Sequence, residues 1–110
     1  MTWSIIALER KSGSLGIAVA SRFFAVGSLV PWIRSGVGAV ATQAMVNPTL
    51  GPAILDRLAA GDPVDTALKA AWGADDGAVV RQVHVLDGKG NRAAHTGGDC
   101  VDWCGDMAGT

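Results

Sequence analysis

The sequence predicts an α+β fold in which a β-sheet is layered with helices. Apolar runs of strand length lie at both ends of the chain, and a stretch with helical period lies between them. The expected order is β-β-β-α-α-β-β. Strands grouped on either side of a helical pair favour this class over a doubly wound parallel sheet, in which strands and helices alternate.

Length and composition predict one domain over residues 1–110. Hydrophobic residues make up 49% of the chain, so disorder is not indicated, and the net charge of -1 with scattered basic residues argues against nucleic-acid binding. The longest apolar stretch, 15–31, carries Arg22, and no secretory signal precedes it, so no membrane segment is expected. We therefore expect a cytoplasmic protein without nucleic-acid or membrane partners.

Two apolar runs near the N-terminus predict a β-hairpin. Residues 3–8 and 15–20 flank the polar, glycine-containing stretch 9–14, which is typical of a turn. Both runs are nearly continuous rather than alternating, so we expect strands that are covered on both faces. Residues 36–42 predict a third strand, and we expect 27–32 before it to be a loop.

The middle of the chain has the period of helices. Asn47 or Thr49 can cap a first helix that ends at Gly61, and its apolar side chains fall on one face. Asp62 is expected to cap a second helix, with the following proline at the first helical position and Gly73 at the end.

The period returns to two over residues 79–86, which predicts a strand with His84 on the side opposite the valines. We expect His84 to be exposed. The stretch 87–90, Asp-Gly-Lys-Gly, predicts a tight turn into a partner strand over 91–96. Residues 97–110 show no clear period.

Two cysteines, Cys100 and Cys104, lie in this last segment. In a reducing compartment a disulfide is not expected. The pair would supply two of the four ligands of a structural zinc, and His95 would be only a third. We interpret the cysteines as ordinary small side chains, with metal or redox work as the alternative, and we predict no metal and no cofactor.

Several stretches resemble the opening of the DUF1028 family. The most specific are Ser21-Arg22-Phe23 and Thr42-Gln43. The other matching stretches are 2–7, 16–20, 25–27, 30–32, 36–44, 47–48, 50–52 and 95–97. Because the similarity runs over essentially the whole chain, the protein is identified as a member of this bacterial, largely uncharacterised family.

The resemblance implies a fold like that of the N-terminal-nucleophile (Ntn) hydrolases, a four-layer α-β-β-α sandwich. Such a sandwich usually needs about twice this length, still within the range of ordinary domains. We therefore expect the chain to be the N-terminal part of the domain, from a truncated gene, an expressed fragment or a cleavage after Thr110. An open sheet edge and bare apolar faces would favour a homo-oligomer or a complementary C-terminal chain.

In Ntn enzymes a Thr, Ser or Cys at the start of the first strand is the nucleophile and its own α-amine is the base. An α-amine titrates near ~7.7 to 8.0, so much of it is neutral in the cell. Thr2 would take this role once Met1 is removed; otherwise it is simply a β-branched residue that begins a strand. Ser4 is the rival nucleophile, on the same side of the strand but without an amine of its own.

Arg22 is the second candidate catalytic residue. A cation that leaves an apolar strand needs an anionic or carbonyl partner. It would bind a carboxylate on the substrate or orient the Thr2 amine; alternatively, it would pair with Glu9 or with an aspartate of the cysteine segment.

The candidate substrate-binding residues are Ser21, Thr42, Gln43, Asn47 and His95. Thr42 and Gln43 end the third strand, where hydroxyl and amide groups can stabilise an oxyanion. Asn47 is explained equally well as a helix cap. His95 could be a general acid, although a lone strand histidine is more often a structural donor.

The leading hypothesis is an Ntn-type hydrolase of a C–N bond, in an amide or cyclic amide of a small nitrogenous metabolite. The alternative is a non-catalytic ligand-binding or assembly module with the same fold, and a third possibility is an inert fragment. The sequence has no Walker-type loop or G-x-G-x-x-G stretch and no paired-carboxylate pattern, so neither nucleotide binding nor glycosidase chemistry is supported.

Overall fold

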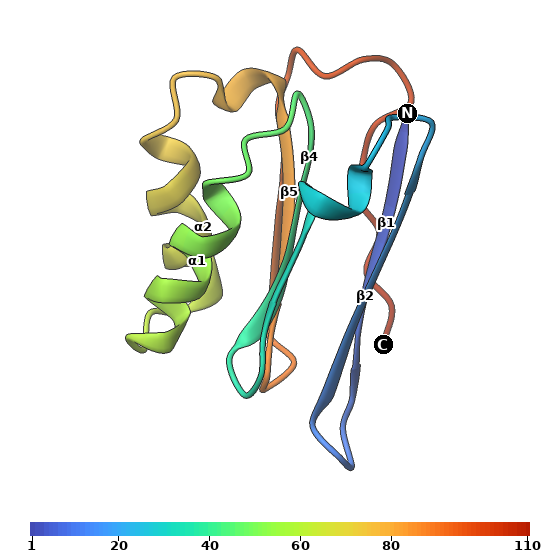
Figure 1. The fold of residues 1–110 in the computed structure, drawn as a ribbon. Coiled ribbons are helices and arrows are strands. Elements are labelled where there is room, and N and C mark those ends of the chain that lie inside the picture. The colour runs from blue at the N-terminus through green and yellow to red at the C-terminus, as the bar shows by residue number, and fades with distance from the viewer.

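The computed structural model describes all of residues 1–110 and has three layers. A four-stranded antiparallel sheet lies in the middle, two α-helices cover one of its faces, and a two-stranded hairpin lies over the other (Figure 1). The α+β class predicted from the sequence is confirmed.

The strands are β1 (Thr2–Glu9), β2 (Ser14–Ser21), β3 (Pro31–Arg34), β4 (Gly38–Ala44), β5 (Arg81–Asp87) and β6 (Arg92–Thr96). The helices are α1 (Leu50–Ala59) and α2 (Val64–Gly73), and two short 3-10 turns are η1 (Val26–Ser28) and η2 (Ala78–Val80). β1 pairs with β2, the central sheet has the order β3-β4-β5-β6, and every pairing is antiparallel.

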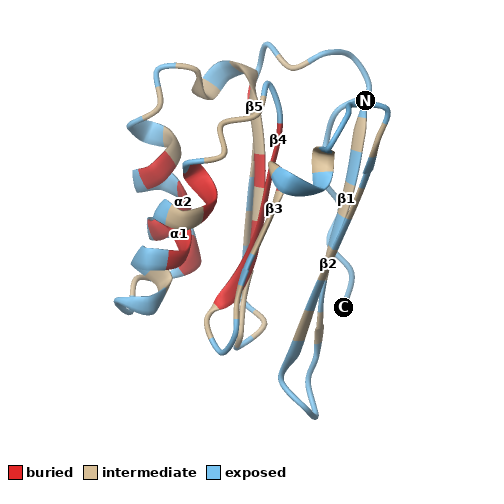
Figure 2. Cartoon of the chain, in the orientation of Figure 1, coloured by how far each residue is buried: buried red, intermediate tan, exposed pale blue.

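The predicted β1–β2 hairpin is present, but its strands are not covered on both faces. Side chains alternate between half-buried and exposed along both strands, and on the outward face Trp3 is 72% and Ile5 65% exposed. The inward face packs against the central sheet, whereas no layer of this chain lies over the outward face (Figure 2). The continuous apolar pattern therefore reflects two apolar faces, of which this chain covers one.

β3 begins inside the stretch 27–32, which was predicted to be a loop, so the observed order has one strand more than predicted. Pro31 begins this edge strand. Proline has no N–H to donate, but at the edge of a sheet no hydrogen bond between interior strands is lost. Trp32 packs directly against Gly51 of α1, leaving no room there for a β-carbon. The contact fixes the first helix on this edge of the sheet.

The core lies between the two helices and the central sheet. Its ten buried residues are Val40, Leu50, Ile54, Leu55, Val64, Ala67, Leu68, Ala71, Val83 and Val85. Each α-helix has only ten residues, about half of what a bilayer crossing requires, and no candidate membrane-spanning helix is found.

The predicted cap of the second helix is wrong by one position. Pro63 is the N-cap residue, and no side chain caps the helix. The Asp62 carboxylate instead forms an ion pair with Arg57 of α1, whose Nε lies 3.1 Å from Asp62 Oδ2.

The β5–β6 hairpin is confirmed. Asp87 closes its turn by accepting hydrogen bonds from the backbone amides of Lys89 and Asn91 at 2.9 and 2.8 Å. Burial acts to raise the pKa of Asp87, but hydrogen bonds, chiefly from Asn91, hold it below its ordinary value. After β6 the chain has no further helix or strand and runs past the N-terminus to the hairpin side (Figure 1).

Candidate functional site

A pocket of about 520 Å³ opens where β1 begins and β2 ends. The hairpin register places Thr2 opposite Ser21, and Arg22 follows directly. Gln43, from the end of β4, also lines the pocket, together with apolar side chains of η1, the β4–α1 loop and residues 99–104. Four of the seven predicted site residues therefore lie around one cavity.

Thr2 is half-buried, and its Oγ1 lies 3.1 Å from Ser21 Oγ. Ser21 Oγ also donates to the Met1 carbonyl at 3.1 Å and accepts from the Phe23 amide at 3.1 Å. A hydroxyl has one proton, and the Met1 carbonyl can only accept, so the Thr2 hydroxyl must donate to Ser21. With Met1 in place, the proton of Thr2 therefore points at its neighbour.

Arg22 is exposed on the pocket wall and takes part in none of the three ion pairs of the chain. The expected alternative partner, Glu9, is occupied elsewhere, because its carboxylate accepts backbone hydrogen bonds from Lys11 and Ser12 in the hairpin turn. The guanidinium is thus free to meet a ligand.

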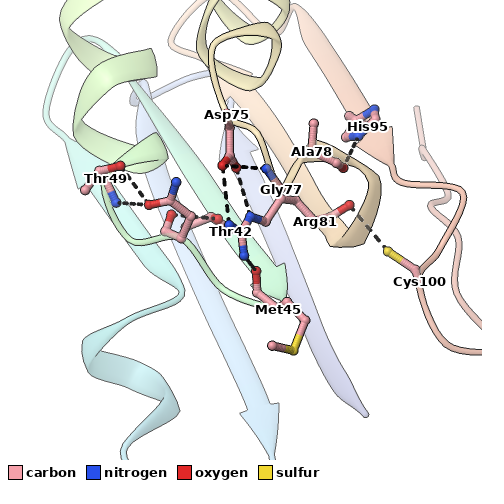
Figure 3. Close-up of polar contacts among 10 residues, drawn as sticks. Thr42, Met45, Thr49, Asp75, Gly77, Ala78, Arg81, His95 and Cys100 are labelled. Carbon is pink, nitrogen blue, oxygen red and sulfur yellow. Dashed lines mark hydrogen bonds and ion pairs between the residues drawn. The ribbon is translucent and has the colours of Figure 1, made fainter.

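Three predicted site residues lie outside the pocket. Thr42 is fully buried on the helix-facing side of β4, and its hydroxyl donates to the Asn47 carbonyl at 3.1 Å (Figure 3). The Asn47 side chain accepts hydrogen bonds from the residue before α1. His95 stacks on Trp72 with ring centroids 4.1 Å apart, and its Nε2 lies 3.0 Å from the Ala78 carbonyl.

Sequence reasoning missed a polar row between the hairpin and the central sheet. Ser4 Oγ lies 2.6 Å from Gln43 Oε1 and 2.7 Å from His84 Nε2, and Gln43 Nε2 donates to Gln82 Oε1 at 2.7 Å. His84 is half-buried, not exposed as predicted, because β1 covers this face of β5. Burial lowers the pKa of His84, and the nearby Asp106 carboxylate opposes that shift.

Arg81 fixes the strand end behind the pocket (Figure 3). Its Nε donates to Asp75 Oδ2 at 2.8 Å, its Nη2 donates to Oδ1 at 3.3 Å, and its Nη1 donates to the Met45 carbonyl. The hydrogen bond from Arg81 holds the pKa of Asp75 below its ordinary value. Ala44, just before Met45, has a left-handed φ of 69°, a conformation that costs about 1–2 kcal/mol for a residue with a β-carbon. The Arg81 contacts hold this strained end in place.

No group of three or more His, Cys, Asp or Glu side chains is placed to hold a metal ion. Cys100 and Cys104 are free thiols on the pocket wall, and the Cys100 thiol donates to the Arg81 carbonyl at 3.4 Å.

The fold and pocket define an α+β domain with a candidate ligand site at the head of its first strand. The chain belongs to the DUF1028 family, a family of unknown function, whose model matches residues 2–110. The structure is similar to the crystal structure of protein SPO2555 from Silicibacter pomeroyi, also matched to DUF1028, with a TM-score of 0.91 and 31% identity. That match covers 94% of this chain and 46% of the other, so this chain spans under half of that protein's length. No curated protein matches the chain.

Proposed function

We propose that this chain carries the nucleophile of an Ntn-type hydrolase that cleaves a C–N bond in an amide or cyclic amide of a small cytoplasmic metabolite. The observation that carries the proposal is the gathering of Ser21, Arg22 and Gln43 around Thr2 in one pocket. The Ntn-hydrolase-like sandwich belongs to the same proposal: helices, sheet and hairpin would be three of its four layers, although β1–β2 here has only two strands.

Catalysis on this proposal begins with removal of Met1, which is 67% exposed. Thr2 Oγ1 then attacks the substrate carbonyl carbon, and its proton passes to the new α-amine of the same residue. The C–N bond breaks as that proton moves to the leaving nitrogen, which leaves an ester on Thr2. Water attacks the ester carbonyl and gives a proton to the amine; the acid product then departs as the amine returns that proton to Thr2 Oγ1, which restores Thr2.

Two further residues that line the pocket, Arg22 and Gln43, have proposed roles. Arg22 has no ion-pair partner and would bind a carboxylate of the substrate or orient the amine. The Gln43 amide donates from Nε2 to Gln82 Oε1 at 2.7 Å and to the Thr2 carbonyl at 3.4 Å, so it would hold Thr2 at the pocket. It would stabilise the oxyanion only by giving up its weaker bond to the Thr2 carbonyl. The Thr42 hydroxyl donates to the Asn47 carbonyl on the helix-facing side of the sheet, so we do not include Thr42 among the residues that contact the substrate. A cavity of about 520 Å³ suits a small molecule.

A second proposal, assembly through the hairpin, rests on the outward face of β1 and β2. Trp3 and Ile5 face outward opposite Ala20 and Ala18, so large and small apolar side chains form an uncovered surface. Contiguous apolar surfaces of this kind mark interaction sites. We propose that a second copy or a complementary C-terminal chain covers it, and a non-catalytic assembly module would need only this surface.

The test of the catalytic proposal begins with the intact mass of natively expressed protein, without an N-terminal tag. A mass lacking one methionine is expected, whereas quantitative retention of Met1 would refute the mechanism and favour the assembly module. Hydrolysis of a panel of small amides and cyclic amides should then be lost in Thr2→Ala and partly kept in Thr2→Ser. Ser12→Ala, in the exposed hairpin turn, is the control and should match the wild type.

A further inference from the structure

The polar row between the two sheets has a fixed direction. It runs from His84 through Ser4 to Gln43, and on to Gln82, over distances of 2.6 to 2.7 Å. Each of these side chains faces the other sheet, and every buried side-chain nitrogen or oxygen of the chain has a hydrogen-bond partner. Such a row can hold a single arrangement only if the donor and acceptor at each link are determined.

The far end of the row is set by a backbone carbonyl. Gln82 Nε2 lies 2.9 Å from the Gly105 carbonyl and 3.1 Å from Thr96 Oγ1. Because a carbonyl oxygen can only accept, the nitrogen of Gln82 must face Gly105. Gln82 Oε1 is therefore the acceptor that faces Gln43.

A second carbonyl sets the middle of the row. Gln43 Nε2 donates to Gln82 Oε1 and, more weakly at 3.4 Å, to the Thr2 carbonyl, so Gln43 Oε1 must accept from Ser4. That bond uses the only proton of the Ser4 hydroxyl. The 2.7 Å contact with His84 then requires a proton on His84 Nε2, which donates to Ser4 Oγ.

We propose that His84 and Ser4 are positioning residues for Thr2. The Nε2–H of His84 fixes Ser4, Ser4 fixes the Gln43 amide, and that amide holds the carbonyl of Thr2 at the pocket. Ser4 is accordingly not a nucleophile, since its proton is committed and the nitrogen beside it carries a proton rather than a lone pair. The link to catalysis rests on the proposed function of Thr2; the direction of the row does not.

The first test needs no variant. In protein labelled with ¹⁵N at histidine and held near pH 8, the ring nitrogen shifts of His84 should show a protonated Nε2 and an unprotonated Nδ1. A neutral His84 protonated on Nδ1 would overturn the proposal, because Ser4 would then have two acceptors and one proton.

The second test removes the centre of the row. Ser4→Ala should shift the backbone resonances of Thr2 and lower kcat about 10- to 100-fold with little change in KM, as a displaced reacting group does. Ser4→Thr, which keeps the hydroxyl, should restore both, and Ser12→Ala should change neither. Unaltered Thr2 resonances in Ser4→Ala would overturn the positioning role. If Thr2 is not the nucleophile, Thr2→Ala keeps whatever activity the wild type has, whereas the Thr2 resonances still respond to Ser4→Ala.

Discussion

Replacing Arg81 with methionine should lower the free energy of unfolding by about 2–4 kcal/mol. Methionine keeps most of the aliphatic stem but leaves the Asp75 carboxylate, only 9% exposed, without its cation. It also removes the donor to the Met45 carbonyl, beside the strained Ala44.

The magnitude follows from the geometry of the pair. Arg81 gives two charge-assisted hydrogen bonds to Asp75, and such bonds contribute about 1.5–3 kcal/mol each. Stranding a charge by breaking a fully buried pair costs about 3–5 kcal/mol. The side chain of Arg81 is 18% exposed, so water relieves part of that cost. The expected loss of about 2–4 kcal/mol is therefore smaller than that of a fully buried pair.

Urea denaturation followed by circular dichroism measures the effect, and Arg34→Met is the matched control. The Arg34–Asp56 pair is 41% and 70% exposed, so its loss should cost about 0–1 kcal/mol.

The pKa of Asp75 is lower in the folded protein than in the unfolded chain. The stabilisation is therefore present above the ordinary carboxyl pKa of about 3.9 and is lost as the pH falls through the folded value. The gap between wild type and Arg81→Met should narrow in acid. A loss under about 0.5 kcal/mol at pH 7, equal to that of an ordinary surface substitution, would refute this reasoning.

Three further predictions concern the packing of α1 on β3, the polar row and the outward face of the β1–β2 hairpin. Gly51→Ala should destabilise the fold by about 1–3 kcal/mol, because the new methyl meets the Trp32 indole; an unchanged melting temperature would contradict the close packing of α1 on β3. The pKa of His84 is lowered in the folded protein by burial, so the unfolded chain binds more protons and stability should decline as the pH falls below about 6.5. His84→Gln should lack that part of the pH dependence in denaturation curves, and identical pH profiles would argue against a buried neutral imidazole. In the double variant Trp3→Lys, Ile5→Lys the free energy of unfolding should stay within about 0.5 kcal/mol per site of the wild-type value, because both side chains are exposed. Self-association measured by sedimentation velocity should fall. A large loss of stability in the monomer would mean that the hairpin needs these side chains for its own fold.

The elements that could be predicted are those whose signals are local. The turn at Asp87 and the glycine-bounded helices depend on residues close in sequence, and their bounds fall within a few residues of the prediction. β3 was missed because its four residues are a strand only by pairing with β4, and a strand beginning with Pro31 carries no period of its own. The cap at Asp62 failed because Arg57, a turn earlier, competes for the carboxylate.

The site divides in the same way. The facing of Thr2 and Ser21 follows from a tight hairpin in register, which the turn sequence indicates. The exposure of His84 could not be deduced, because alternation separates the two faces of a strand without saying whether the second meets water or another sheet. The side of the sheet on which Thr42 lies depends on the register of β4. A shift of one residue would move its side chain from the core to the face that lines the pocket.

The hydrogen bond from Ser21 to the Met1 carbonyl bears on how this protein is handled at the bench. Any purification handle fused upstream keeps an acyl group on the nitrogen of Thr2, so an inactive fusion of that kind says nothing about turnover. A handle placed after Thr110, or one cut off to leave threonine first, gives the measurement its meaning.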